Sequence, residues 1–405
     1  MFRATRVARE LVRGGAVVHM VWGGTRLPKI NVDGLEMTWL EPVRVDGADF
    51  QNLVKLDGSP VDDALKNARR DSILALFHET RPDMVITEAY PFGRRQMRFE
   101  LEPLMHAARV ASWHPVTVAS IRDIMTENRA EKRVRESIAM ARDFFDLILV
   151  HGDPDLIRIE ETLQGADEIL HKVRYGGLVT PEPPDLGIAP SITADVVVSA
   201  GGGAVGHALT AAAPQAMQFS RTFPSNWLLI VGPERPQEDT DALAAAAPPG
   251  MRVERFVPDL ARVLASARVS VSRAGYNTTG DLMRAGTRCV LAPFAGGRET
   301  EQLRRAEIFA AKGLATLLRD EEMTPQTLAA AIDRAATLPP MRAGFDLEGA
   351  SHAATILWNI WKIRFALLKA TSSLERFQFG ILQTIENNGL FLDTAWMGRY
   401  QHPVN

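Results

Sequence analysis

Residues 269–281 read VSVSRAGYNTTGD, and this stretch decides the fold because a short β-branched strand leads through a glycine turn into a helix. We expect the strand to end at Ser272 and the turn to use Gly275, with Asn277 or Thr278 capping the helix. The first backbone N–H groups of such a helix attract an anion at the carboxyl edge of the sheet. The stretch therefore predicts one unit of a doubly wound α/β domain with a phosphate site.

The alternation of strand and helix extends in both directions from this stretch. In the second half, strands are predicted at 195–199, 227–231, 252–256, 269–272, 288–294 and 315–318. In the first half, strands are predicted at 17–22, 36–40, 83–87, 116–121 and 147–151, and helices near 3–13, 62–79, 95–109 and 130–144. This pattern is typical of parallel strands joined by crossover helices. We expect an α/β protein with two tandem Rossmann-like domains that face a shared cleft.

The two halves are separated by a stretch without periodicity that runs from Val173 through four prolines to Pro190. We expect an N-terminal Rossmann-like domain at 1–175, a linker at 176–192, a second Rossmann-like domain at 193–345, and a C-terminal helix and tail at 346–405. We expect the first domain to lack its first strand, because the chain begins with the helix that should follow the glycine-rich turn. Two explanations stay open. Either Met1 is an internal start, or the sheet has one strand fewer and no ligand loop at its first crossover.

The composition excludes several classes of protein. Of 405 residues, 46 are Lys or Arg and 49 are Asp or Glu, and the net charge of −3 leaves no global positive field to bind nucleic acid. The single cysteine, Cys289, excludes a disulfide framework and a thiolate zinc cluster, and we expect it to be a buried strand residue in a reducing cytosol. We expect neither a signal peptide nor a membrane span, and therefore a cytoplasmic protein.

The C-terminal residues 358–405 lose the alternation of strand and helix. Apolar and aromatic residues recur at spacings of three and four between Trp358 and Leu368, with basic residues among them. This pattern predicts an amphipathic helix with a basic side. The helix either packs back on the first domain or contacts a membrane surface.

A glycine cluster follows the strand predicted at 195–199. Residues 199–206 read SAGGGAVG, and Gly201, Gly202 and Gly203 would let backbone N–H groups approach a phosphate or a sugar. The cluster also matches the dinucleotide-binding fingerprint, with Glu234 as its acidic residue, so a nicotinamide oxidoreductase is one interpretation. The match does not discriminate, because any tight strand-to-helix turn selects glycine.

A third strand end, residues 293–302, reads PFAGGRETEQ. Gly296 belongs to its turn, and Glu299 and Gln302 are three residues apart, so both can hydrogen-bond a polyhydroxylated ligand from one side of a helix. Asp281, one turn into the preceding helix, has two interpretations. It accepts hydrogen bonds from the hydroxyls of a ribose, or it complements the positive end of its own helix.

Together these loops carry a resemblance to a known family. The run from Val271 to Ala306 resembles the donor-binding half of family 28 glycosyltransferases. The type member is the N-acetylglucosaminyltransferase that completes the lipid intermediate of peptidoglycan (MurG-like). Bacterial predicted glycosyltransferases similar to it also carry sequences like PFGRRQMRFE at 91–100, SIRDI at 120–124 and VHGDP at 150–154. The likeness covers about residues 2–340.

The resemblance implies a two-domain glycosyltransferase (GT-B) that binds a nucleotide sugar, usually a UDP-sugar, on its C-terminal domain and the acceptor on its N-terminal domain. It implies no metal ion and no other cofactor. By position, the resemblance implies that Gly201 to Gly203 approach the diphosphate and that Arg273 contacts the nucleotide. Asp281 would bind the ribose, and the sugar hydroxyls would be bound by Glu299, Thr300 and Gln302. Two features depart from the family. Its ribose carboxylate is a glutamate, and its glycine–histidine turn after the first strand is absent from this chain.

Transfer from a diphosphate donor requires a base that deprotonates the acceptor hydroxyl and positive charge at the departing diphosphate. The candidates for the base follow strands of the first domain, and they are Glu88, Asp123 and His151. We rank Glu88 first because it ends a strand and precedes a glycine-containing loop. Each candidate has an alternative role as a strand-end cap or as a partner of Arg94, Arg95 or Arg122.

The leading hypothesis is an inverting glycosyltransferase that moves a hexose or N-acetylhexosamine to a glycan or a lipid-linked acceptor. It would be cytoplasmic, with peripheral contact at the inner face of the membrane. Hydrolysis or epimerisation of a UDP-sugar on the same scaffold is one alternative. A noncatalytic protein that binds sugar nucleotides is another, and a nicotinamide oxidoreductase ranks last.

Overall fold

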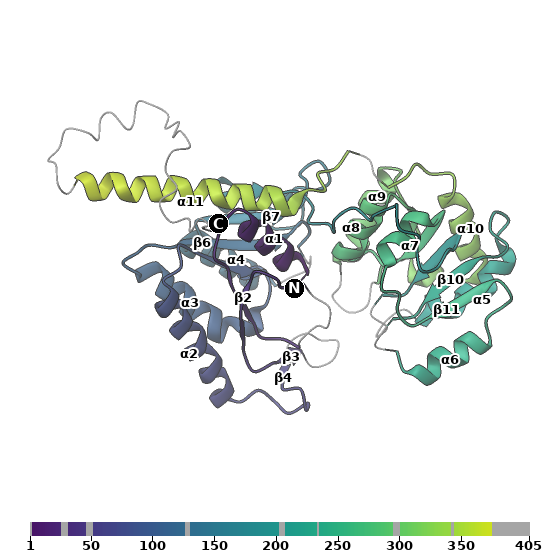
Figure 1. Ribbon diagram of the computed structural model, residues 1–405, viewed down its shortest axis with the longest axis horizontal. Coiled ribbons are helices and arrows are strands. Elements are labelled where there is room, and N and C mark those ends of the chain that lie inside the picture. The colour runs from purple at the N-terminus through teal and green to yellow at the C-terminus, as the bar shows by residue number, and fades with distance from the viewer. Residues whose placement is uncertain are drawn as a thin grey trace, which may run out of the picture.

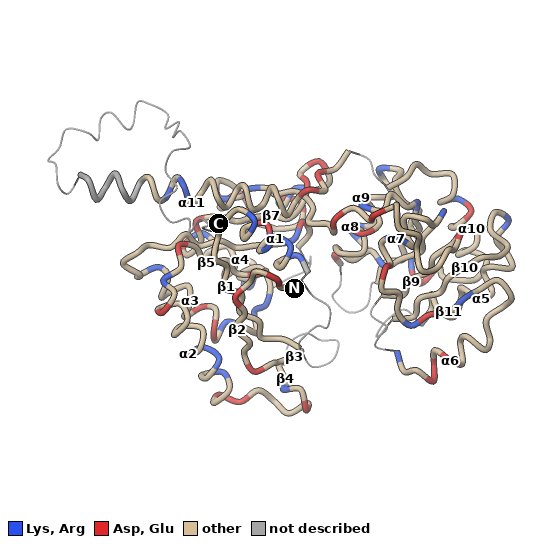
Figure 2. Tube along the Cα trace, viewed as in Figure 1, with Lys and Arg blue, Asp and Glu red and all other residues tan. Residues whose placement is uncertain are grey.

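The structure is a computed structural model that describes residues 2–25, 31–45, 52–125, 130–201, 207–232, 235–294, 300–341 and 344–374. Figure 1 shows two α/β bodies, with the N-terminal half at the left and the second half at the right. The final helix returns to the first body. Acidic and basic residues are interspersed over both bodies (Figure 2), as the small net charge of −3 suggests.

The second body is built on one parallel sheet of six strands in the order β11-β10-β9-β12-β13-β14. Its strands are β9 (Val196–Ser199), β10 (Trp227–Ile230), β11 (Met251–Glu254), β12 (Val269–Ser272), β13 (Arg288–Leu291) and β14 (Thr316–Leu317). Its helices are α5 (His207–Phe219), α6 (Gln237–Ala245), α7 (Leu260–Ser266), α8 (Tyr276–Ala285), α9 (Glu301–Ala311) and α10 (Pro325–Ala335). The six predicted strands are confirmed, although β13 ends before Pro293, which could not donate to the sheet.

Both faces of this sheet are covered, which is why its central strands are continuous valine-rich runs. Val196, Val198 and Val271 pack with α5 and α10 on one side. Val197 and Leu291 pack with α7, α8 and α9 on the other. The strand order reverses between β9 and β12, and in doubly wound sheets the carboxyl ends at such a point flank the ligand site.

The first body contains a parallel sheet in the order β5-β6-β7-β8, formed by Met84–Glu88, Val116–Arg122, Leu147–His151 and Val173–Tyr175. Helices α2 (Asp63–Thr80), α3 (Arg98–Val110) and α4 (Glu131–Phe144) cover one face. Helices α1 (Phe2–Arg13) and α11 (Gly349–Leu374) cover the other. Strand β8 was not predicted, because only three residues pair before the proline-rich stretch begins.

Two further strands stand apart from this sheet. Strands β1 (His19–Trp22) and β2 (Glu36–Trp39) pair only with each other among the described residues, and β5 pairs only with β6. Ile86 on β5 is accordingly 41% exposed. A short antiparallel pair, β3 (Arg44–Val45) and β4 (Leu53–Val54), completes this half.

A buried ion pair fastens the β1–β2 unit to the helices of the first body. The guanidinium of Arg69 on α2 binds both carboxylate oxygens of Glu100 on α3, at 2.8 and 2.9 Å. It also donates to the carbonyl oxygens of Gly23 and Glu41, which follow β1 and β2. Because both carboxylate oxygens and all three guanidinium nitrogens are hydrogen-bonded, two charges can be buried together here.

The predicted terminal helix begins at Gly349, within the predicted segment 346–405 and nine residues before the amphipathic pattern that starts at Trp358. Ala353 and Leu357 pack against Val7 and Leu11 of α1, so the helix lies on the first body (Figure 1). In the part of the chain that the structure describes, no helix is long and apolar enough to cross a membrane. Residues 375–405 lie outside the described residues.

Candidate active site

Three strand ends of the second sheet lie side by side. The pairing of β9, β12 and β13 places Ser199 beside Ser272 and Ser272 beside Leu291. The loops predicted to bind the donor therefore start at one edge of the sheet. Gly201, directly after β9, has a φ of 88°, a conformation that favours glycine. Three further glycines of this prediction, Gly202, Gly203 and Gly296, lie outside the described residues, as does Glu299.

Helix α8 begins at this edge, but its cap differs from the prediction. Gly275 is the N-cap, with an extended backbone, and its carbonyl accepts from the N–H of Thr279 at 3.0 Å. Asn277 and Thr278 lie inside the first turn, so the prediction that one of them caps the helix is wrong. Because the N-cap is a glycine, no side chain caps α8. Uncapped N–H groups at a helix start are a suitable place for a diphosphate.

Asp281 on α8 faces the first domain. It interacts electrostatically with Arg6 of α1, and burial raises the pKa of its carboxyl to about 6 despite the opposing effect of that guanidinium. Arg6 in turn reaches the carbonyl oxygen of Val179 at 3.4 Å. Asp281 therefore lies where the two domains meet, and its contact with a ribose stays a prediction.

Replacing Asp281 by asparagine is expected to stabilise the protein at pH 8. The folded-state pKa of about 6 lies above the ordinary value of 3.8, so ionisation opposes folding increasingly as the pH rises from about 4 to 6. The gain should be roughly 1 to 3 kcal/mol above pH 7 and should vanish near pH 4. Thermal unfolding of both proteins at pH 4.5 and 8 would measure it. An equal loss of stability at both pH values would contradict this environment for Asp281.

Other residues predicted to bind the donor have contacts within the second domain. Arg273 is buried, and its Nη1 donates to the carbonyl oxygen of Ala292 at 2.9 Å and to Asp320 Oδ1 at 2.7 Å. Gln302 Oε1 accepts from the N–H of Phe294 at 3.3 Å and so joins α9 to the end of β13. Thr300 is the N-cap of α9. The contacts of Arg273, Thr300 and Gln302 with a donor stay predictions.

On the first domain, three neighbouring strands bring polar side chains together. Ser120 Oγ on β6 lies 3.2 Å from Glu88 Oε2 at the end of β5 and 2.8 Å from His151 Nε2 at the end of β7. Arg3 of α1 forms an ion pair with Glu88 Oε1. Of these side chains, only that of Glu88 is substantially exposed, at 29%. Burial, with Arg3 as a smaller cause, lowers the pKa of His151 well below its usual value, so the ring is neutral.

Asp123 forms a salt bridge between the domains. Its Oδ1 accepts from Arg305 Nη2 of α9 at 2.7 Å, and the two side chains are 0% and 1% exposed. Glu301 binds the same guanidinium at 3.0 Å and reaches Arg122 of the first domain at 3.0 Å. Burial would raise the pKa of Glu301, but the guanidiniums of Arg305 and Arg122 hold it below the usual value. The partners that the sequence offered as an alternative role for Asp123 were arginines of the first domain, whereas its partner comes from the second.

Tyr276 completes the junction and was missed by sequence reasoning, as were Arg3 and Arg305. The guanidiniums of Arg3 and Arg305 lie 5.3 and 5.7 Å from its ring centroid. Its hydroxyl accepts from the N–H of Val179 at 2.9 Å, and burial raises its pKa to about 12. A continuous polar layer thus lies where the first domain meets the start of α8, and it consists of Glu88, Arg3, Tyr276, Arg305 and Asp123. For Arg305, the sequence carried one signal of an ion pair, which is its spacing of four from Glu301 on the same predicted helix.

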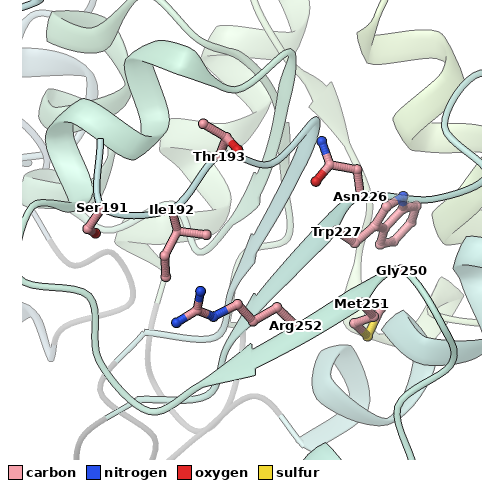
Figure 3. A pocket seen from close by; sticks show the side chains of 8 residues that line it. All are labelled: Ser191, Ile192, Thr193, Asn226, Trp227, Gly250, Met251 and Arg252. Atoms are coloured by element: carbon pink, nitrogen blue, oxygen red, sulfur yellow. The ribbon is translucent and has the colours of Figure 1, made fainter. Parts of the chain in front are cut away.

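An open cavity of about 430 Å³ lies elsewhere, beside Trp227, Met251 and Arg252 (Figure 3). Trp227 and Met251 are the first residues of β10 and β11. The cavity therefore lies at the amino edge of the second sheet, opposite the strand ends described above. In doubly wound sheets ligands bind at the carboxyl edge.

The second domain is similar to a known family. Residues 196–344 match the glycosyltransferase family 28 C-terminal domain. Over 86 residues, the chain is 34% identical to the UDP-N-acetylglucosamine–N-acetylmuramyl-(pentapeptide) pyrophosphoryl-undecaprenol N-acetylglucosamine transferase of Thermotoga neapolitana. That stretch is 21% of this chain and covers 25% of the relative's length. The sequence resemblance to family 28 is thereby confirmed.

Solved structures share the fold of most of the chain. The glycotransferase of kitacinnamycin superposes with a TM-score of 0.59 at 17% identity, over 88% of this chain and 95% of that one. MurG of Acinetobacter baumannii gives a TM-score of 0.56 at 17% identity, with the same coverage. The predicted GT-B arrangement of two Rossmann-like domains is confirmed.

Proposed function

We propose that the protein is a glycosyltransferase that moves a hexose or N-acetylhexosamine from a UDP-sugar to an acceptor hydroxyl, with inversion and without a metal ion. The observation that carries this proposal is the alignment of Ser199, Ser272 and Leu291 beside the uncapped start of α8, within a family 28 domain. Such a site supplies backbone N–H groups and a helix dipole to a diphosphate. The relative from Thermotoga neapolitana is named for a UDP-sugar and a lipid-linked acceptor, which supports the same classes here.

In the proposed reaction, the acceptor occupies the side of the first domain. Glu88 removes the proton of the acceptor hydroxyl as its oxygen bonds to the anomeric carbon. The bond from this carbon to the diphosphate breaks, and the N–H groups of α8 stabilise the departing charge. Asp123 holds the domains together, since its carboxylate is already bound to Arg305. The acceptor is a glycan or a lipid-linked sugar, and the protein acts in the cytoplasm or at the inner face of the membrane.

A panel of labelled nucleotide sugars, each with and without candidate acceptors, tests this proposal. Release of nucleoside diphosphate only when an acceptor is present supports a transferase. Release without an acceptor would instead make the protein a hydrolase, and binding without turnover would make it a sugar-nucleotide-binding protein.

Replacing Gln302 by alanine is expected to weaken the binding of the donor sugar by about 1 to 3 kcal/mol, because a buried hydrogen bond to a hydroxyl is lost. Calorimetry with the nucleotide sugar measures the change. Gln218→Ala is a matched control, since Gln218 is an exposed residue of α5. Unchanged affinity in Gln302→Ala would remove this residue from the site.

A further inference from the structure

The hydrogen bonds around Ser120 have a direction that the chemistry of the three groups determines. Glu88 as a carboxylate only accepts hydrogen bonds, so the single proton of the Ser120 hydroxyl is donated to Glu88 Oε2, at 3.2 Å. The hydroxyl oxygen is then left as the acceptor for His151 Nε2, at 2.8 Å. His151 must therefore carry its proton on Nε2. The chain runs from His151 through Ser120 to Glu88.

The other ring nitrogen of His151 is consistent with this direction. His151 is 1% exposed, and its Nδ1 has no hydrogen-bond partner among the described residues. A ring with its one proton on Nε2 leaves Nδ1 as a bare acceptor, whereas a proton on Nδ1 would be a buried donor without a partner. Among the described residues, the ring of His151 has its hydrogen bond with Ser120 Oγ, so the two side chains form one hydrogen-bonded unit beside Glu88.

We propose that Ser120 and His151 are positioning residues for Glu88, which they hold in the orientation that takes the proton of the acceptor hydroxyl. This inference rests on the proposed transferase function. Arg3 binds the other carboxylate oxygen, Oε1, so the carboxylate is held from both sides while part of it stays exposed. Each carboxylate oxygen has a second lone pair, so Glu88 can still accept a proton from a bound hydroxyl. A base that is held in one geometry acts more often on a correctly placed substrate.

The test is a comparison of kcat and KM in Ser120→Ala. We expect kcat to fall by roughly tenfold, while KM for the donor changes less than about twofold. The fall in kcat is smaller than the hundredfold or greater contribution of a general base, because Glu88 itself is still present. Two conservative variants should retain most of the kcat of the original protein. They are Ser120→Thr, which keeps the hydroxyl, and His151→Gln, which keeps an N–H donor. The matched control is Ser137→Ala, because the Ser137 hydroxyl donates to the carbonyl oxygen of Pro91 at 2.9 Å in the same domain. Its kcat should equal that of the original protein.

A second measurement does not depend on activity. In protein labelled with ¹⁵N-histidine, NMR should show His151 neutral and protonated on Nε2 between pH 5 and 8, with an Nε2 resonance that shifts in Ser120→Ala. A proton on Nδ1 would overturn the proposal. So would an active protein whose kcat is unchanged in Ser120→Ala, and in that case the transferase function would stand. If no acceptor-dependent transfer occurs in the original protein, the proposed function fails and this inference fails with it.

Discussion

Replacing Arg305 by methionine is expected to lower the free energy of unfolding by about 3 to 5 kcal/mol. Arg305 and Asp123 are 1% and 0% exposed, and they join the two domains across 182 residues of sequence. Methionine fills a similar space but leaves the Asp123 carboxylate buried without its partner. Removing one partner of a buried ion pair lowers stability by more than the intact pair contributes to it, because the remaining charge is buried and cannot reach water. Urea unfolding of the two proteins measures the difference.

Two further variants control this experiment. Arg304, the preceding residue, reaches Glu161 of the first domain at 3.7 Å, and the two side chains are 38% and 49% exposed. Arg304→Met should therefore change stability by less than about 1 kcal/mol. Asp123→Asn combined with Arg305→Met should recover much of the loss, because no unpaired charge remains. If Arg305→Met is no worse than Arg304→Met, the salt bridge does not stabilise the junction of the domains.

Replacing Glu88 by glutamine is expected to lower kcat by about a hundredfold to ten-thousandfold, because an amide cannot take the proton of the acceptor hydroxyl. Binding of the donor should change little, since Glu88 lies on the first domain and the donor loops on the second. Steady-state kinetics and donor titration measure the two quantities. Glu102→Gln is the control, because Glu102 is paired with Arg98 on the surface of α3. Retention of kcat in Glu88→Gln would assign the proton transfer to another group.

The strands of both domains could be predicted because their signals are local. Strands β9 and β12 are short, valine-containing and buried on both faces, and each is followed by a glycine-containing turn, so the sequence alone places Ser199 and Ser272 at one edge. Helix boundaries were less accurate. Residues 277 and 278 have side chains that commonly cap helices, but the chain already turns at Gly275, which takes the cap position. Strand β8 has only three residues and gives no periodic signal.

The contacts between the domains could not be predicted from local patterns. Asp123 and Arg305 are brought together only when the two domains meet, and the same is true of Arg3 and Tyr276. Ser120 lies inside a buried strand, where a serine gives no signal until its neighbours on β5 and β7 are known. The sequence thus predicted Glu88 and His151 as separate candidates. The structure shows that they share one hydrogen-bonded serine.

The most direct test of this account is a crystal structure of the protein with bound UDP. We expect the diphosphate to lie within hydrogen-bond distance of the N–H groups in the first turn of α8, next to the ends of β9 and β13. The central claim would be contradicted if UDP occupied the opposite edge of the sheet, such as the cavity beside Trp227 and Arg252 (Figure 3), and left α8 without a ligand.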